Sequence, residues 1–301
     1  MARALLITNP VAARTTDRIL GRIEQLFGDA GWGIEVRVTT GHGDANRFAL
    51  EGLGRGVEVV LVFGGDGTTM QAAAALVGTD VPLGLLPGGT GNLLAANLGL
   101  PANPLEAARV IIAGAPGRID LGRLESSSGV RYFAVAAGAG VDARVMIETS
   151  SAMKRRWGTM AYVAKTLQLL PNLASHRFRI TVDGVVHDVD AAMMLVANCG
   201  MIIPPILSLG NHVSPVDGVL DIVILQASSV AGGVRAVWDL VRDAKGTFGK
   251  DVFIARHRGK EVAVEVLDGV QPVQMDGEAG GETPFTITVL PAALQVIQAA
   301  R

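Results

Sequence analysis

The sequence predicts an α/β protein of two domains, and three observations support that prediction. The chain has 301 residues, which corresponds to about two domains at roughly 150 residues each. Over residues 1–121, short apolar runs alternate with stretches of helical periodicity, as in a parallel sheet covered by helices. Beyond that point, strand-like runs follow one another. We therefore expect an α/β domain over 1–121, rejoined by the tail 291–301, and a β-rich antiparallel domain over 122–290.

The first domain is expected to alternate strand and helix four times. Its strongest strand signal is the run VEVVLVF at 57–63, because a nearly continuous apolar run indicates a buried strand. The helix at 17–27 follows from apolar residues at helical spacing, and the glycines after Phe27 end it. The expected strands are 4–8, 34–39, 57–63 and 81–86, and the expected helices are 17–27, 44–52, 69–77 and 93–98.

The second domain is expected to be mostly antiparallel strands. Asp183-Gly184 and Asp268-Gly269 lie between strand candidates, and this dipeptide suits a hairpin turn. The expected strands are 118–124, 131–136, 176–182, 185–189, 191–197, 220–225, 261–266, 273–275 and 285–290, with helices at 154–170 and 230–243.

Composition excludes several classes of protein. Hydrophobic residues make up 49% of the chain and charged residues 18%, which excludes a disordered chain. Residues 81–105 and 191–216 carry no Asp, Glu, Lys or Arg, yet their prolines and glycines are incompatible with a membrane-spanning helix. The net charge of -2 gives no basic field for nucleic acid. The single cysteine, Cys199, excludes an intramolecular disulfide, and the N-terminus lacks a signal-peptide pattern, so we expect a cytoplasmic protein.

Two glycine-rich loops, 64–68 and 87–92, each connect a predicted strand to a predicted helix. Glycine lets backbone N–H groups approach a phosphate, and the N-terminus of a helix adds partial positive charge. Asp66 in the first loop would repel phosphate unless it meets a cation, such as the Mg²⁺ of a nucleotide. A glycine-rich turn with Asp66 as an N-cap is the alternative. Neither loop has the Walker spacing, and no GxGxxG motif follows the first strand.

Asp276 and Glu278 form a candidate acidic pair near the end of the chain. On a strand, residues two apart lie on one face, whereas in a turn they would be arranged differently. The alternative is a plain surface turn, because Asp-Gly is a common turn pair.

Several motifs together resemble a known family. They are Asn9-Pro10 after the first strand, GGDGTT at 64–69, LPGGTGNLLAANLGLP at 86–101 and MDGE at 275–278. In this order they resemble the diacylglycerol kinase catalytic family, and within it the soluble bacterial lipid kinases; sphingosine and ceramide kinases are relatives. The resemblance covers nearly the whole chain. It implies an ATP- and Mg²⁺-dependent lipid kinase with its active site in the cleft between two domains.

The resemblance also assigns roles to individual positions. The positions expected to bind ATP are Asn9, Thr40, Gly64, Gly65, Asp66, Gly67, Thr68, Thr69, Gly89 and Thr90. Asp66 matches the aspartate associated with the Mg²⁺ of the nucleotide. Asp276 and Glu278 match the acidic pair of which one is the base toward the lipid hydroxyl. The side chain of Asp217 and the backbone carbonyls of Ser214 and Val219 match the ligands of a structural Mg²⁺ ion.

Two positions depart from the family pattern and leave an inactive paralogue as an alternative, and the GGDGT motif leaves a second alternative because another class of kinase shares it. Met70 and Gln71 stand where many members have Asn and Glu. A soluble-substrate kinase of the NAD kinase type shares GGDGT, and an inactive lipid-binding regulatory paralogue is the other alternative.

The predicted partners follow from the lipid substrate. The cluster Lys154, Arg155, Arg156 and Trp157 joins cations to an aromatic side chain, which suits transient contact with anionic headgroups at the inner membrane surface. A solvated charge run is the alternative for this cluster. We expect no nucleic-acid partner, and a homodimer is a further possibility.

Overall fold

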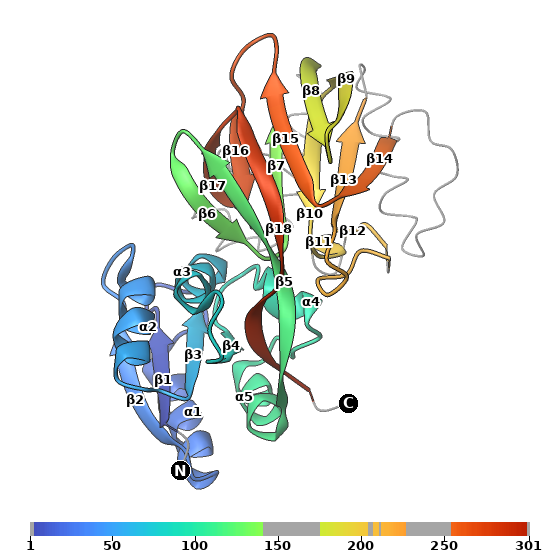
Figure 1. Cartoon of the computed structure of the whole chain (residues 1–301). Coiled ribbons are helices and arrows are strands. Elements are labelled where there is room, and N and C mark those ends of the chain that lie inside the picture. Colours follow the sequence, from blue (N-terminus) through green and yellow to red (C-terminus); the bar gives the residue numbers. More distant parts are fainter. Residues whose placement is uncertain (1–2, 141–174, 204–206, 211, 227–253, 300–301) are drawn as a thin grey trace. The chain divides into compact units, whose positions relative to one another are not determined.

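The computed structural model describes residues 3–140, 175–203, 207–210, 212–226 and 254–299. It has two compact units, one of Met1–Ile119 with Ala292–Arg301 and the other of Asp120–Pro291 (Figure 1). We call these the first unit and the second unit. The predicted fold class is confirmed, since the first unit contains a parallel sheet with helices and the second is built from antiparallel strands.

The sheet of the first unit is parallel and runs in the order β2–β1–β3–β4, with the end of β18 beside β4. The tail returns to this sheet through Val296, which pairs with Leu83. Every residue of β3 and β4 is buried, because helices cover both faces. The strands are β1 (Arg3–Thr8), β2 (Gly33–Val38), β3 (Val59–Gly64), β4 (Leu83–Pro87) and β18 (Phe285–Gln298).

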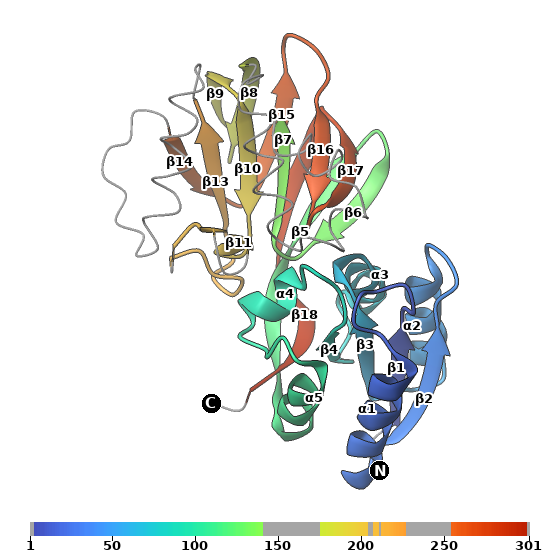
Figure 2. The ribbon, with the colours of Figure 1, turned by 180° about the vertical axis from the view of Figure 1, so that it is seen from behind.

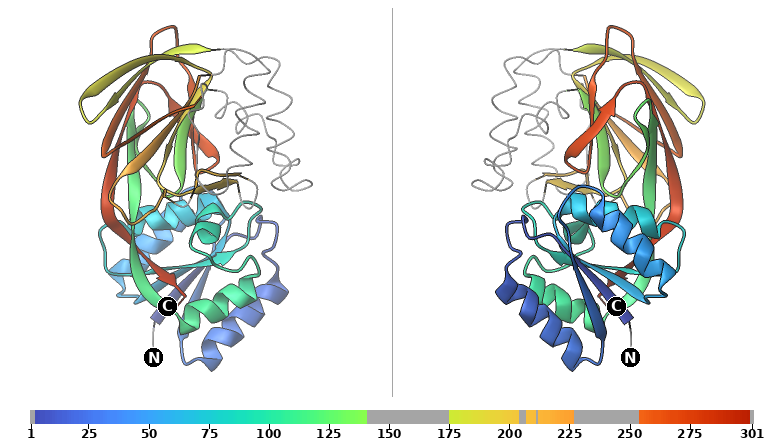
Figure 3. Two further views of the ribbon diagram at one scale, coloured as in Figure 1. Left: turned by 90° about the vertical axis from the view of Figure 1, so that its right-hand side faces the viewer. Right: turned by 90° about the vertical axis from the view of Figure 1, so that its left-hand side faces the viewer.

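The helices α1 (Asp17–Asp29) and α5 (Pro104–Ala113) lie on one face of this sheet, and α2 (Asp44–Gly54) and α3 (Asp66–Leu76) lie on the other (Figure 3). The short helix α4 (Leu93–Asn97) follows β4. The sequence analysis missed α5, although Asn followed by Pro is a typical start of a helix. In the structure the Asn103 side chain accepts from Leu105 N at 2.9 Å, and Pro104 is the first residue of the helix.

The strand order places a switch point between β1 and β3. The chain leaves β1 toward β2 on one side and leaves β3 toward β4 on the other, although the two strands stay paired up to Thr8 and Phe63. In open α/β sheets, ligands bind at such a switch point. Asn9 and the loop that begins at Gly64 lie there.

The second unit is a sandwich of two antiparallel sheets (Figure 2). Their facing sides share one core, in which Phe178 and Val264 of one sheet pack with Met194 and Ile222 of the other. One sheet contains part of β18 with β15 (Glu261–Val266), β8 (His176–Val182), β9 (Val185–Ala191), β5 (Ala115–Ser126) and β6 (Gly129–Phe133). The other contains β14 (Ile254–Gly259), β13 (Leu220–Leu225), β10 (Met193–Ala197), β7 (Ala136–Gly140), β16 (Pro272–Met275) and β17 (Glu278–Glu282). A two-stranded pair, β11 (Met201–Ile203) and β12 (Leu207–Ser208), also belongs to this unit.

The two predicted Asp-Gly turns have different outcomes. Asp183 and Gly184 have φ angles of 47° and 84° and connect β8 to β9, so this hairpin prediction is confirmed. The prediction for Asp268-Gly269 is wrong, because β15 and β16 belong to different sheets and the chain passes there from one to the other. The helices expected at 154–170 and 230–243 lie outside the described residues. Within the described ranges, no helix has the length and apolar character needed to cross a membrane.

Candidate functional site

The two glycine-rich loops of the first unit pack directly against each other. The carbonyl oxygen of Gly64 accepts hydrogen bonds from Gly88 N at 2.8 Å and from Gly89 N at 3.1 Å. A Cβ atom on Gly89 would lie 2.7 Å from the Cα atom of Gly65, closer than the two atoms can approach. Glycine is therefore required at Gly89 because backbone meets backbone, whether or not a phosphate is bound.

Asp66 connects these two loops through its carboxylate. Oδ2 accepts from Asn92 N at 2.8 Å and Oδ1 accepts from Leu93 N at 2.5 Å, where α4 begins. The N-cap of α3 is Gly65, so the alternative in which Asp66 caps its own helix is wrong. A negative charge at the start of a neighbouring helix is favourable because its first N–H groups lack intrahelical partners. Asp66 thus fixes the second loop relative to the first.

Asn9 and Thr68 meet at the switch point between β1 and β3. The Nδ2 atom of Asn9 donates to Thr68 Oγ1 at 3.0 Å, and its Oδ1 atom accepts from Val11 N at 3.0 Å. Thr68 is buried and belongs, with Gly67, to the first turn of α3. The first N–H groups of an α-helix are not used by the helix's own hydrogen bonds, so those of Gly67 and Thr68 suit a phosphate that approaches the helix N-terminus.

Thr40 is held by α2 rather than by the glycine-rich loops. Its N–H and hydroxyl groups both donate to Asp44 Oδ2 at 2.8 Å. The Arg47 guanidinium and the bonds from Thr40 hold the pKa of Asp44 well below its usual range. Gln71 of α3 accepts from Gly43 N at 2.9 Å through its Oε1 atom. The departure at Gln71 therefore has a structural role, as a neutral acceptor that holds the Thr40 loop.

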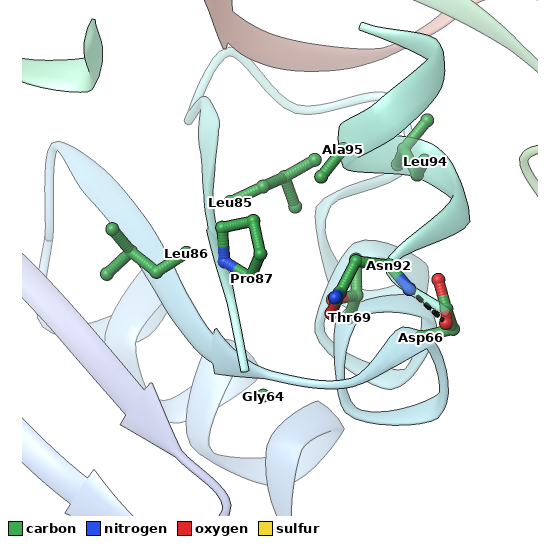
Figure 4. A pocket seen from close by; sticks show the side chains of 9 residues that line it. All are labelled: Gly64, Asp66, Thr69, Leu85, Leu86, Pro87, Asn92, Leu94 and Ala95. Carbon is green, nitrogen blue, oxygen red and sulfur yellow. Dashed lines mark hydrogen bonds between the residues drawn. The ribbon is translucent and has the colours of Figure 1, made fainter. Parts of the chain in front are cut away.

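A small pocket lies beside the loops, between β4, α3 and α4 (Figure 4). Polar side chains line one part of it and apolar side chains line the rest. Thr69 contributes to the polar part, and Thr90 is half-buried in the second loop. The lining residues are Gly64, Asp66, Thr69, Leu85, Leu86, Pro87, Asn92, Leu94 and Ala95.

Asp276 lies in a hairpin turn of the second unit, but its carboxylate is buried. The φ angles of 47° at Asp276 and 82° at Gly277 give the turn that joins β16 to β17. Its Oδ2 atom accepts from Ala134 N at 2.8 Å, and Oδ1 accepts from Val135 N at 2.8 Å and Ala136 N at 3.0 Å. The residue is only 8% exposed, so the alternative of a plain surface turn is wrong.

The surroundings of Asp276 make it a stronger base than an ordinary aspartate. Burial raises the pKa of Asp276, the three backbone N–H groups lower it and the negative charge of Glu278 raises it, and the net result is a pKa of about 6. A group with this pKa is mostly ionised at pH 7 and still accepts a proton readily.

Glu278 has a different environment from Asp276. It begins β17 and is exposed, opposite the buried Met275. A strand would have put both carboxylates on one face, and the structure shows the turn arrangement instead.

The proposed structural Mg²⁺ ligands lie around an arginine. Asp217 Oδ2 is 2.5 Å from Arg258 Nη2, and Arg258 Nε is 3.3 Å from Asp221 Oδ1. Asp217 Oδ1 also accepts from Val219 N at 3.3 Å, and Ser214 is half-buried in the same loop. Because the guanidinium already neutralises Asp217, this arrangement fits a Mg²⁺ ion only if Arg258 is displaced.

The sequence analysis missed the backbone segment that binds Asp276, and one predicted cluster lies outside the described residues. The segment 134–136 binds Asp276 through backbone N–H groups, so its sequence, Ala-Val-Ala, carries no side-chain signal. The cluster Lys154, Arg155, Arg156 and Trp157 lies outside the described residues, and its contact with a membrane stays a prediction.

Comparisons with known proteins agree with this architecture. Residues 3–124 match the family described as diacylglycerol kinase catalytic domain, and residues 135–298 match the YegS C-terminal NAD kinase beta sandwich-like domain. A diacylglycerol kinase of Mycobacterium tuberculosis is 33% identical, over 99% of this chain and 96% of the relative. One of Bacillus subtilis is 30% identical, over 94% and 92%.

Solved structures show the same fold. A chain from Bacillus anthracis superposes with a TM-score of 0.82 at 25% identity, over 98% of this chain and 96% of that chain. A diacylglycerol kinase structure from the same organism has a TM-score of 0.77 at 23% identity, with the same coverage. With both units matched in order and two relatives at 30% identity or more over nearly their full lengths, the chain belongs to the diacylglycerol kinase catalytic family and is a lipid kinase.

Proposed function

We propose that this kinase transfers the γ-phosphoryl group of ATP to a hydroxyl group of a diacylglycerol-like lipid, with Mg²⁺ on the nucleotide and Asp276 as the base. Membership of a kinase family implies ATP as the phosphate donor. The oxygen of the lipid hydroxyl forms a bond to the γ-phosphorus, while the bond between this phosphorus and the bridging oxygen breaks and ADP leaves. The proton of the hydroxyl goes to Asp276.

The nucleotide side of the proposal rests on the first unit. The first turn of α3, from Asp66 to Thr68, offers N–H groups and the positive end of a helix dipole to the phosphates. Mg²⁺, when bound, neutralises charge that develops on the transferring phosphoryl group. Asp66 is the carboxylate of this loop that would face the ion, and its bonds to the start of α4 fix its position.

The buried carboxylate of Asp276 is the observation that carries the proposal. Its Oδ1 atom accepts two N–H groups, which use both of its lone pairs, whereas Oδ2 accepts one from Ala134. We therefore assign Oδ2 as the atom that orients the lipid hydroxyl. An alcohol is a weak acid, so the proton moves to Oδ2 late, as the bond to phosphorus forms.

Radiolabelled ATP and a panel of acceptors test the function. We expect label in diacylglycerol when it is compared with phosphatidylglycerol, sphingosine and ceramide in mixed micelles with Mg²⁺. Label in one of the other lipids in place of diacylglycerol would assign that lipid as the acceptor. Phosphorylation of NAD in a detergent-free assay would support the soluble-substrate alternative. Binding of ATP and lipid with no labelled product would support an inactive paralogue.

Replacement of Asp66 by Asn should destabilise the first unit and reduce turnover. The carbonyl oxygen of Asn can accept from either Asn92 N or Leu93 N, and its NH₂ group then faces the other N–H group. The two N–H groups are half-buried, so leaving one unpaired should cost up to about 1–3 kcal/mol, the penalty for a fully buried donor. Urea unfolding of Asp66→Asn measures this loss. The control is Asp80→Asn, which removes only an exposed ion pair with Arg118 and should leave stability within about 0.5 kcal/mol. Equal stability of the two variants would contradict the role of Asp66 as the link between the loops.

Thermal unfolding with and without EDTA tests whether Arg258 takes the place of the structural Mg²⁺ ion. We expect the same melting temperature for the nucleotide-free protein in Mg²⁺ and in EDTA, since Asp217 is already neutralised. Arg258→Met should lower the melting temperature and make it rise with added Mg²⁺, because it frees two carboxylates for the cation. A wild-type melting temperature that falls in EDTA would instead show that Asp217 holds Mg²⁺.

A further inference from the structure

We propose that Asn198 and Cys199 are positioning residues for Asp276, because they hold the segment 134–136 whose N–H groups bind its carboxylate. This inference rests on the proposed function, in which Asp276 is the base. Asn198 and Cys199 follow β10 in the sheet that also contains β7 and β16, and all of these residues belong to the second unit.

The two residues bind the carbonyl side of the segment. Asn198 donates from its backbone N to Val135 O at 2.8 Å and from Nδ2 to Ala134 O at 2.8 Å. Cys199 donates from its backbone N to Val135 O at 3.1 Å and from Sγ to Ala134 O at 3.2 Å. The carbonyls of Ala134 and Val135 thus each receive two donors, while the N–H groups of 134–136 point to Asp276.

The choice of Asn at position 198 indicates that its donor is needed. Nδ2 donates to Asp120 O at 2.9 Å as well as to Ala134 O, so a flipped amide would direct its oxygen at two carbonyls. In the orientation found, the side chain is fully buried and Oδ1 has no hydrogen-bond partner among the described residues. An apolar residue would avoid that cost, and a buried unsatisfied group in a native structure calls for a reason. Holding Ala134 in place is such a reason.

The contacts also affect the charge state of Asp276. Hydrogen bonds in a chain polarise one another, so donors on the carbonyls of Ala134 and Val135 strengthen the N–H groups on the other side of the peptide planes. Among the described residues, the titratable groups that interact with Asp276 are Glu278 and Cys199, and Asp120 acts on Cys199. Arg131 donates to Ala279 O beside them. Burial and the charges of Asp276 and Asp120 raise the pKa of the Cys199 thiol well above its usual range, so it stays a neutral donor.

The pH profile of kcat/KM for the lipid, measured from pH 5 to pH 8, separates positioning from stability. A base gives an acid limb, which should lie near the pKa of Asp276. Asn198→Ala should weaken the N–H bonds to the ionised carboxylate, and the limb should move upward by about half a pH unit or more. Turnover should fall about tenfold or more, while KM for ATP stays unchanged. A limb that does not move, whatever the loss of turnover, would overturn the inference.

Three further variants complete the test. Ile222→Val in β13 trims the same core and should lower the melting temperature without moving the limb. Cys199→Ser keeps a donor and should retain the wild-type limb. If Asn198→Ala does not fold, Asn198→Ser replaces it in the test. Ser keeps one short donor, so the acid limb should move upward and turnover should fall, both by less than in Asn198→Ala. Asp276→Asn distinguishes the two levels of argument: full turnover in that variant would overturn the proposed function, whereas lost turnover with an unmoved limb in Asn198→Ala would overturn this inference alone.

Discussion

Replacement of Asp276 by Asn should reduce kcat by roughly 10²–10⁴-fold, the contribution that a positioned general base makes. The amide cannot accept a proton from the lipid hydroxyl. The carboxylate accepts from the N–H groups of Ala134 and Val135 with its two oxygens. In the amide, one of these oxygens becomes an NH₂ group, which faces an N–H donor and cannot accept from it. ATP binding should persist, because the nucleotide contacts proposed above lie in the first unit. Steady-state turnover of lipid and calorimetric titration with ATP measure the two quantities separately.

The chain supplies a matched control for this variant. Asp183 is also the aspartate of an Asp-Gly turn, with a φ angle of 47°, and its Oδ1 atom accepts from Lys260 N and Glu261 N at 2.9 Å each. Asp183→Asn therefore removes a carboxylate from the same kind of turn without touching the base. Its kcat should equal that of the wild type. If Asp276→Asn also retains full turnover, Asp276 is not the base.

Much of the fold could be predicted from local pattern. Strand and helix alternation in the first unit follows from apolar periodicity, which depends only on neighbours in sequence. The boundaries that failed have identifiable causes. The helix expected from residue 69 begins at Asp66, because its first turn includes Gly67, which the sequence analysis treated as loop. The strand expected over 285–290 continues through Pro291 to Gln298, although proline lacks the N–H group that a strand normally uses in pairing.

The candidate site was less predictable, because most of its contacts join distant parts of the chain through the backbone. GGDGTT and MDGE drew attention to Asp66 and Asp276 as carboxylates. Their hydrogen-bond partners are N–H groups of residues 92–93 and 134–136, and nearly every residue has such a group. Sequence can therefore name the charged side chain, but it does not name the partners that set its position and pKa. Asn198 illustrates the same limit, since a lone Asn in an apolar run has no motif.

Replacement of Gly89 by Ala should separate the two glycine-rich loops and abolish efficient turnover. The added Cβ would lie 2.7 Å from Gly65 Cα and 3.2 Å from Asn92 Oδ1, so backbone must move. Such overpacking costs about 1–3 kcal/mol. The movement would also break the bond from Gly89 N to Gly64 O and shift the turn that begins α3. A displacement of about 1 Å in a positioning element can cost roughly 10²-fold in rate.

Gly65→Ala is the control that separates loop packing from nucleotide approach. Its Cβ would lie 3.6 Å from Gly89 Cα, an ordinary contact, and its φ angle of -96° is open to any residue. We therefore expect Gly65→Ala to unfold in urea like the wild type, whereas Gly89→Ala unfolds earlier. ATP affinity should fall in both variants. In Gly89→Ala the second loop is displaced, and in Gly65→Ala a methyl group stands where the backbone is proposed to approach a phosphate. Wild-type affinity for ATP in Gly65→Ala would remove Gly65 from the nucleotide site, and equal stability of the two variants would contradict the packing of Gly89 on Gly65.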